Sequence, residues 1–170
     1  MIEILILYQL KEKVLTMYGI SKEINANFSA LTTPSFGTIK PALLRLEKNG
    51  YIKTQKNITD GGRPSIYYSI TNAGKDRLVE LILAPLPINP VQFLPTARIK
   101  IACSELLSNS EQIELLKKIK LKSENIVLDI KNIQESRKID FYKNIVFENL
   151  ICEYKNFILL LEGLERASKN

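Results

Sequence analysis

Apolar residues recur every three to four positions through most of the chain, which is the spacing of one face of an α-helix. We therefore expect helices over residues 2–15, 22–28, 35–49, 71–83, 96–107, 108–135 and 139–167. Residues 51–71 alternate instead between apolar and polar positions around a turn rich in glycine and proline, which predicts a β-hairpin. The pattern is that of a mostly α protein with a small β-hairpin.

The helix expected over residues 35–49 has two contrasting faces. Ser35 is a capping residue, and Asn49-Gly50 is a helix stop. The apolar face comprises Phe36, Ile39, Leu43 and Leu46. The opposite face carries small and basic residues, which are Thr38, Pro41, Arg45 and Lys48, flanked by Lys40. A face of this kind suits the floor of a DNA major groove, although an ordinary amphipathic helix is the alternative for this stretch alone.

Pro41 complicates the start of this helix. In a helix that begins just after Ser35, the proline ring lies beyond the first turn and meets the carbonyl of Gly37. We therefore expect a distorted or late start, near Thr38. Gly37 eases the bend and leaves the backbone close to whatever the helix faces.

The order of the elements up to residue 83 is helix, helix, basic helix, hairpin and helix, which is that of a winged helix-turn-helix. Ser21 is expected to cap the second helix and Thr71 the one after the hairpin. The hairpin, or wing, spans residues 58–65 at its tip, where Gly62 and Arg63 reach toward the DNA backbone. Lys53 and Lys56 on the first wing strand add phosphate contacts. The alternative is that the tip is a mere connector.

Prolines 85, 87, 90 and 95 interrupt the helical pattern and exclude a continuous helix there. We expect a winged-helix DNA-binding domain over residues 1–83, a proline-rich linker over 84–95 and a helical dimerisation domain over 96–170. In this last domain Ser108 and Glu111 have the spacing of a capping box, and two long helices form an antiparallel hairpin.

The last helix carries more apolar residues than one partner helix can cover. Since burying such a side chain is worth ~1.5–3 kcal/mol, we expect a second subunit to cover the surplus. The expected homodimer interface comprises Leu150, Ile151, Tyr154, Phe157, Ile158 and Leu161. The alternative is that the surplus packs on the helix over residues 2–15 of the same chain.

Charge and composition limit the classes of function that the chain can have. Residues 35–77 contain eight Lys or Arg and three acidic residues, which favours a polyanionic partner. The chain has no histidine, the usual general base and zinc ligand, and its two cysteines show no metal-ligand spacing. No apolar run reaches the ~18 residues needed to span a bilayer. We expect no catalytic residue, metal, cofactor or membrane partner, and a cytoplasmic protein.

Residues 37–52, Gly-Thr-Ile-Lys-Pro-Ala-Leu-Leu-Arg-Leu-Glu-Lys-Asn-Gly-Tyr-Ile, resemble the Gly-Thr-Leu-Tyr-Pro-x-Leu-x-Arg-Leu-Glu-x-x-Gly helix of PadR-family transcriptional regulators. Residues 62–64 and 67–74 are similar to that family's wing and the start of its next helix. The resemblance covers residues 1–82 and implies a dimeric repressor that binds palindromic double-stranded DNA and is released by a small-molecule or stress signal. Lys40 stands where the family usually has tyrosine.

Two other functions are weighed against this one. A winged-helix module could bind an acidic protein partner through the same basic face, since both partners are recognised electrostatically. An enzyme is disfavoured by the absence of histidine and of a phosphate-binding glycine loop.

Overall fold

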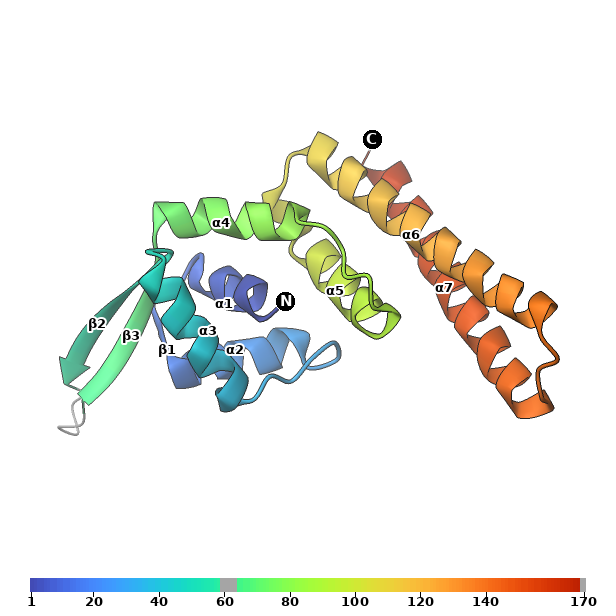
Figure 1. The fold of residues 1–170 in the computed structure, drawn as a ribbon. Helices are drawn as coiled ribbons and strands as arrows, with labels where there is room; N and C mark the ends of the chain where they lie inside the picture. The colour runs from blue at the N-terminus through green and yellow to red at the C-terminus, as the bar shows by residue number, and fades with distance from the viewer. Residues whose placement is uncertain (59–63, 169–170) are drawn as a thin grey trace. The chain divides into compact units, whose positions relative to one another are not determined.

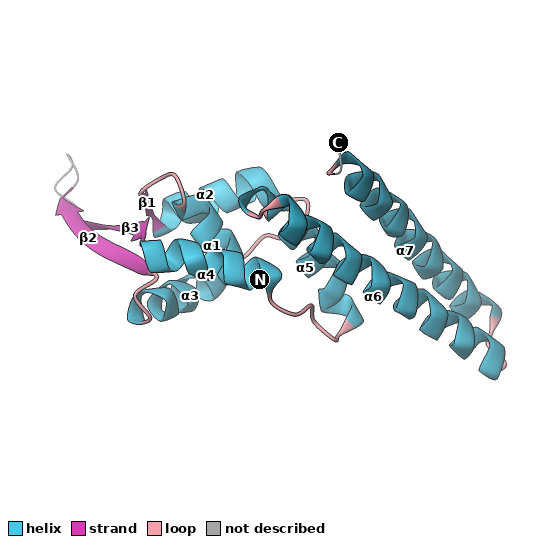
Figure 2. Cartoon of the chain, turned by 90° about the horizontal axis from the view of Figure 1, so that it is seen from above, coloured by secondary structure: helices cyan, strands magenta, loops and turns pink. Residues whose placement is uncertain are grey.

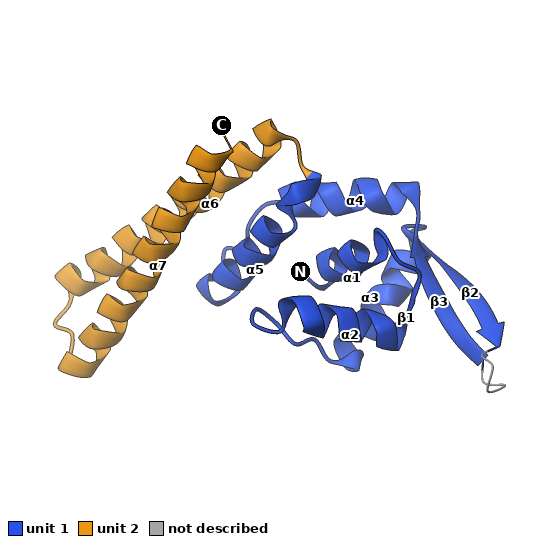
Figure 3. Ribbon diagram, turned by 180° about the vertical axis from the view of Figure 1, so that it is seen from behind, with its two compact units in different colours: residues 1–106 blue, residues 107–170 orange. Residues whose placement is uncertain are grey.

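The computed structural model describes residues 1–58 and 64–168, which fall into two compact units. Unit 1 comprises Met1–Leu106 and unit 2 begins at Leu107 (Figure 3). The division differs from the expected one, because residues 84–106 belong to the first unit.

Unit 1 is mainly helical, with a small antiparallel sheet of order β1-β3-β2. Its elements are α1 (Ile2–Leu10), β1 (Leu15–Thr16), α2 (Met17–Phe28), α3 (Phe36–Lys48), β2 (Ile52–Ile58), β3 (Pro64–Ile70), α4 (Asn72–Leu83), α5 (Pro90–Ala102) and a 3-10 turn, η1 (Ser104–Leu106). In the β2–β3 hairpin Thr54 lies opposite Tyr68. The hairpin projects from the helices of the unit, as a wing does (Figures 1 and 2).

Helix α1 is the centre of unit 1, because α2, α3, α4 and β3 all pack against it. Leu5, Ile6 and Leu7 follow one another in sequence and are all completely buried. Three consecutive buried side chains point in different directions around a helix, so α1 is covered on nearly all sides. This agrees with the apolar character expected for the first helix.

The start of the chain differs from the expected pattern. The first helix ends at Leu10 rather than near residue 15, and the two-residue strand β1 that follows pairs with β3. Helix α2 begins at Met17 because the hydroxyl of Thr16 accepts a hydrogen bond from Gly19 N at 3.1 Å. The prediction that Ser21 caps this helix is therefore wrong, and Ser21 is buried inside it.

The proline-rich stretch is also corrected in its second half. Helix α5 begins at Pro90, the first helical position, where the missing amide donor costs nothing. The side chain of Asn89 caps it by accepting from Val91 N at 2.9 Å. Residues 90–95, expected as linker, are thus helical despite Pro95, and only residues 84–89 form a non-helical connection.

Unit 2 is an antiparallel hairpin of α6 (Asn109–Ser136) and α7 (Phe141–Ala167). The expected capping box at Ser108 and Glu111 is confirmed in both of its hydrogen bonds. Lys120 of α6 forms an ion pair with Glu162 of α7 at 2.6 Å. Gln134, near the end of α6, donates to Asn144, near the start of α7, at 2.8 Å, so side-chain contacts join the two helices at two separate points. Within the described residues, no helix combines the length and apolar character needed to cross a membrane.

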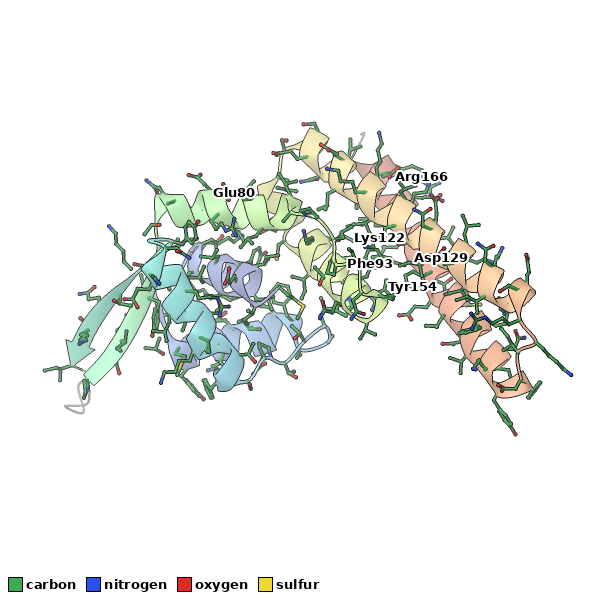
Figure 4. All side chains as sticks on the ribbon, viewed as in Figure 1. Glu80, Phe93, Lys122, Asp129, Tyr154 and Arg166 are labelled. Carbon is green, nitrogen blue, oxygen red and sulfur yellow. The ribbon has the colours of Figure 1, made fainter. Side chains whose placement is uncertain are left out.

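Most of the side chains expected at the dimer interface are covered within the single chain. Ile151, Tyr154, Phe157 and Leu161 are buried, and Leu150 and Ile158 are half-buried (Tyr154 is labelled in Figure 4). Instead, exposed residues that recur every three to four positions, singly or as adjacent pairs, follow another side of α7: Tyr142, Ile145, Val146, Asn149, Cys152, Asn156, Leu159 and Leu160. We call these eight uncharged residues the outer face of α7. Cys152 is exposed on this face, whereas Cys103, the residue that follows α5, is buried.

Candidate nucleic-acid interface

Helix α3 is anchored by one face and presents the other to solvent. Ile39, Ala42, Leu43 and Leu46 are buried against the rest of unit 1. The residues of α3 and its cap that were predicted to face DNA are all exposed, namely Ser35, Gly37, Thr38, Lys40, Pro41, Arg45 and Lys48. Phe36, expected in the apolar face, is instead 47% exposed at the first turn. The exposed surface therefore begins with an aromatic ring and becomes basic further along.

The helix begins at Phe36, so the predicted late start near Thr38 is wrong. Ser35 occupies the capping position without a side-chain cap, and its hydroxyl lies 3.3 Å from that of Thr38. Pro41 is exposed and lies inside the helix. Proline has no backbone N–H, so the carbonyl oxygen of Gly37 does not receive the helical hydrogen bond that residue 41 would otherwise donate. The predicted stop is confirmed, since Gly50 has a φ of 73°.

Arg45 is not a free side chain on this surface. Its Nε lies 3.0 Å from Oε1 of Glu3, which belongs to α1. The Arg45 side chain is about half exposed and that of Glu3 is mostly covered. A carboxylate at the base of the basic face thus holds the arginine in place and partly neutralises it.

The wing is joined to α3 through a carboxylate. Thr54 of β2 donates from its hydroxyl to Oε1 of Glu47 at 2.6 Å. Burial and the nearby Glu47 charge raise the pKa of Tyr68, which lies opposite Thr54 in the sheet. Side chains alternate along a strand, so Lys56 lies on the same face as Thr54, toward α3, and Lys53 on the other face. Gly62 and Arg63 lie outside the described residues.

The base of the wing is fixed by Thr71, the cap of α4. Its hydroxyl accepts from Gly74 N at 3.0 Å and lies 2.8 Å from the carbonyl oxygen of Gly50, to which it donates. A Cβ on Gly74 would lie only 2.0 Å from the carbonyl oxygen of Tyr51. This close approach requires glycine and holds α4, the end of α3 and the wing in one arrangement.

Two residues of the interface are not predicted from the sequence. Leu44 is 58% exposed in the middle of the face that also carries Gly37, Pro41 and Lys48. Its position on a helical wheel could have revealed it, and an outward leucine there is suited to the methyl group of thymine. Glu3, the partner of Arg45, lies 42 positions away in the chain, and no local pattern points to that pairing.

Comparison with known proteins shows which protein family has a similar sequence. The model of the transcriptional regulator PadR-like family matches residues 6–80, which cover most of unit 1. A PadR family transcription regulator from Clostridium difficile R20291 is 34% identical, and the match covers 46% of this chain and 79% of that chain, with a TM-score of 0.41. The chain belongs to the PadR-like family.

This PadR-like protein is also similar to PadR of Bacillus subtilis at 20% identity. The crystal structure of that protein with operator DNA matches over 98% of both chains with a TM-score of 0.47. Its structure with p-coumaric acid matches over 99% of both chains with a TM-score of 0.43. No curated protein matches the sequence. Family membership makes the chain a DNA-binding transcriptional regulator rather than an enzyme, as the sequence predicts.

Proposed function

We propose that this PadR-like regulator is a cytoplasmic repressor that binds palindromic operator DNA as a homodimer and releases it when a small molecule binds. Sequence-specific binding to DNA is supported by the exposed face of α3, where small residues precede three basic ones, Lys40, Arg45 and Lys48. Small residues let the helix approach base edges closely, and the basic residues reach guanine or the flanking phosphates.

The residues of this surface have different tasks. Thr38, Pro41, Leu44 and Arg45 approach base edges, while Ser35 and Gly37 allow the start of α3 to lie close to the duplex. Lys40 and Lys48 flank the groove. Lys53 and Lys56 on β2, with Gly62 and Arg63 beyond the described residues, contact the sugar-phosphate backbone. Family members usually carry tyrosine at position 40, so Lys40 should make operator contacts that differ from those of its relatives.

The decisive experiment selects bound duplexes from a random pool and compares wild type with Arg45→Ala. A bidentate contact to guanine is worth roughly 1–3 kcal/mol of discrimination, so the variant should lose about 5- to 150-fold in affinity for the selected site. Binding to a scrambled duplex should change far less. Equal binding of both proteins to both duplexes would exclude the base-reading role of Arg45.

The proposed dimer uses the outer face of α7. The side chains first expected there are already buried, whereas the outer face leaves Tyr142, Leu159 and Leu160 more than half exposed. A two-fold axis through this face would bring identical apolar residues together. Two copies of α3 related by such an axis match a palindrome, which is how helix-turn-helix dimers bind.

An acidic protein partner is the alternative for the basic face, and family membership favours DNA instead. A footprint on the promoter of the protein's own gene separates the two. Protection of a two-fold symmetric site supports the regulator. Absence of protection, together with tight binding to an acidic protein, supports the interaction module.

A further inference from the structure

Unit 1 contains a cavity of about 430 Å³ between α1, the end of α4 and α5. This volume lies within the range of about 300–1,000 Å³ that small-molecule sites occupy. Its walls are mostly apolar and include Ile4, Leu81, Pro85 and Val91. None of the DNA-facing residues of α3 lines the cavity.

Three polar side chains of the cavity lie on one side of α5. Gln92, Thr96 and Lys100 are spaced four residues apart, so they share one face of the helix. Burial increases along this line, because Gln92 is exposed, Thr96 is 7% exposed and Lys100 only 2%. The cavity therefore runs from an exposed amide to a buried ammonium group.

Lys100 lacks a negatively charged partner among the groups that the structure describes around it. Its Nζ donates to the carbonyl oxygen of Ile82 at 3.0 Å and to that of Ala84, at the end of α4. Burial lowers the pKa of Lys100 to about 8, and no carboxylate opposes this shift. An ammonium group has three donors, so one remains beyond the two carbonyls. A buried charge of this kind favours an anion as its third partner.

We propose that this cavity binds a small apolar molecule that carries a carboxylate, with the carboxylate on Lys100 and the apolar part against Ile4, Leu81 and Val91. Thr96 and Gln92 hydrogen-bond polar substituents along the same edge. The inference that this cavity is the effector site of the regulator rests on the proposed function. The inference that it binds a carboxylate does not depend on that function, and it can be tested without DNA.

The probe is octanoate, with octanamide as a neutral analogue of similar shape, and binding to the full chain is measured by calorimetry. Octanoate should bind wild type roughly 10- to 100-fold more tightly than octanamide, as expected for a charge-assisted contact. Lys100→Met should remove this preference. The control Lys22→Met, which removes an exposed lysine of α2, should preserve it.

A second variant guards against misfolding of Lys100→Met, because that lysine also caps α4. Val91 is exposed at the rim of the cavity, so Val91→Trp places a large ring at its entrance without disturbing the core and should weaken binding of both probes. The proposal is overturned if neither probe binds wild type, if acid and amide bind alike, or if Val91→Trp binds octanoate normally. Operator binding measured without a probe reports separately on the proposed function.

Discussion

At the scale of single residues, the interface depends on how Arg45 is held. An arginine that reads bases must lie in one orientation before DNA arrives, because ordering its long side chain costs free energy. The ion pair with Glu3 supplies that order and also removes part of the positive charge that attracts DNA. The two effects oppose each other, and their magnitudes decide the result of removing Glu3.

Glu3→Gln should raise affinity for DNA. Because the pair is partly exposed, its interaction is worth about 0.2–1 kcal/mol, so we expect a gain of up to about fivefold, on operator and scrambled duplex alike. Fluorescence anisotropy at several salt concentrations measures it. Glu12→Gln removes the same charge from unit 1 at a site that pairs with Lys11 instead, and should have a smaller effect. A loss of affinity in Glu3→Gln would show that orientation outweighs neutralisation.

The residue-level prediction from sequence succeeded where helix geometry alone decides. The 3.6-residue period identifies Thr38, Arg45 and Lys48 as outward, and they are exposed. It fails at Phe36, because the first turn of α3 lies at the edge of the core, where one side of the helix has nothing to pack against. It cannot find Glu3, because that contact is made by tertiary packing of α1 on α3.

At the scale of elements, the junction of α3, the wing and α4 depends on Gly74. Gly74→Ala should lower the free energy of unfolding by about 1–3 kcal/mol, since the new methyl group meets a backbone carbonyl that cannot move aside without shifting the wing. Urea denaturation measures this change.

The matched control for this change is Gly163→Ala in α7, where a Cβ meets nothing within 4 Å. Alanine is the better helix former, so this variant should be neutral or more stable by up to about 1 kcal/mol. If the two variants had equal stability, the close approach at Gly74 would carry no energetic weight.

The two lysines of β2 should differ in their effect on DNA binding. Lys56 shares the strand face of Thr54, which is bonded to α3, and Lys53 points to the other face. Lys56→Ala should therefore weaken binding to all sequences and reduce the slope of affinity against salt by about one ion, whereas Lys53→Ala should change both less. Titrations of the operator at a series of salt concentrations measure the slope, and an equal loss in both variants would contradict the assignment of faces.

Long or strongly marked elements were predicted well. The capping box starts α6 at the expected residue, and the glycine stop ends α3 where expected. Strand β1 was missed because two residues carry no pattern and form a strand only by pairing with β3. The start of α5 differs from the predicted start at residue 96, because Pro90 occupies the first helical position, where a proline begins a helix rather than breaking it.

At the scale of the whole molecule, the proposed dimer can be broken at the outer face of α7. Leu159→Glu should shift the protein from dimer to monomer in sedimentation and weaken operator binding, because a charge buried at a two-fold axis meets its own copy. The control Lys155→Glu places an acid at an exposed position of the same helix outside the outer face, and should leave the dimer intact. A dimer that survives Leu159→Glu places the interface elsewhere.

The different settings of the two cysteines provide a reporter for this assembly. Burial raises the pKa of Cys103 to about 12, so its thiol is inert at neutral pH, whereas Cys152 is exposed near the middle of the outer face. A maleimide fluorophore should therefore label the native protein at one position without any engineered cysteine. If the outer face is the subunit contact, labelling is fast in dilute protein and slows as concentration rises, so the chain's own chemistry records when two subunits meet.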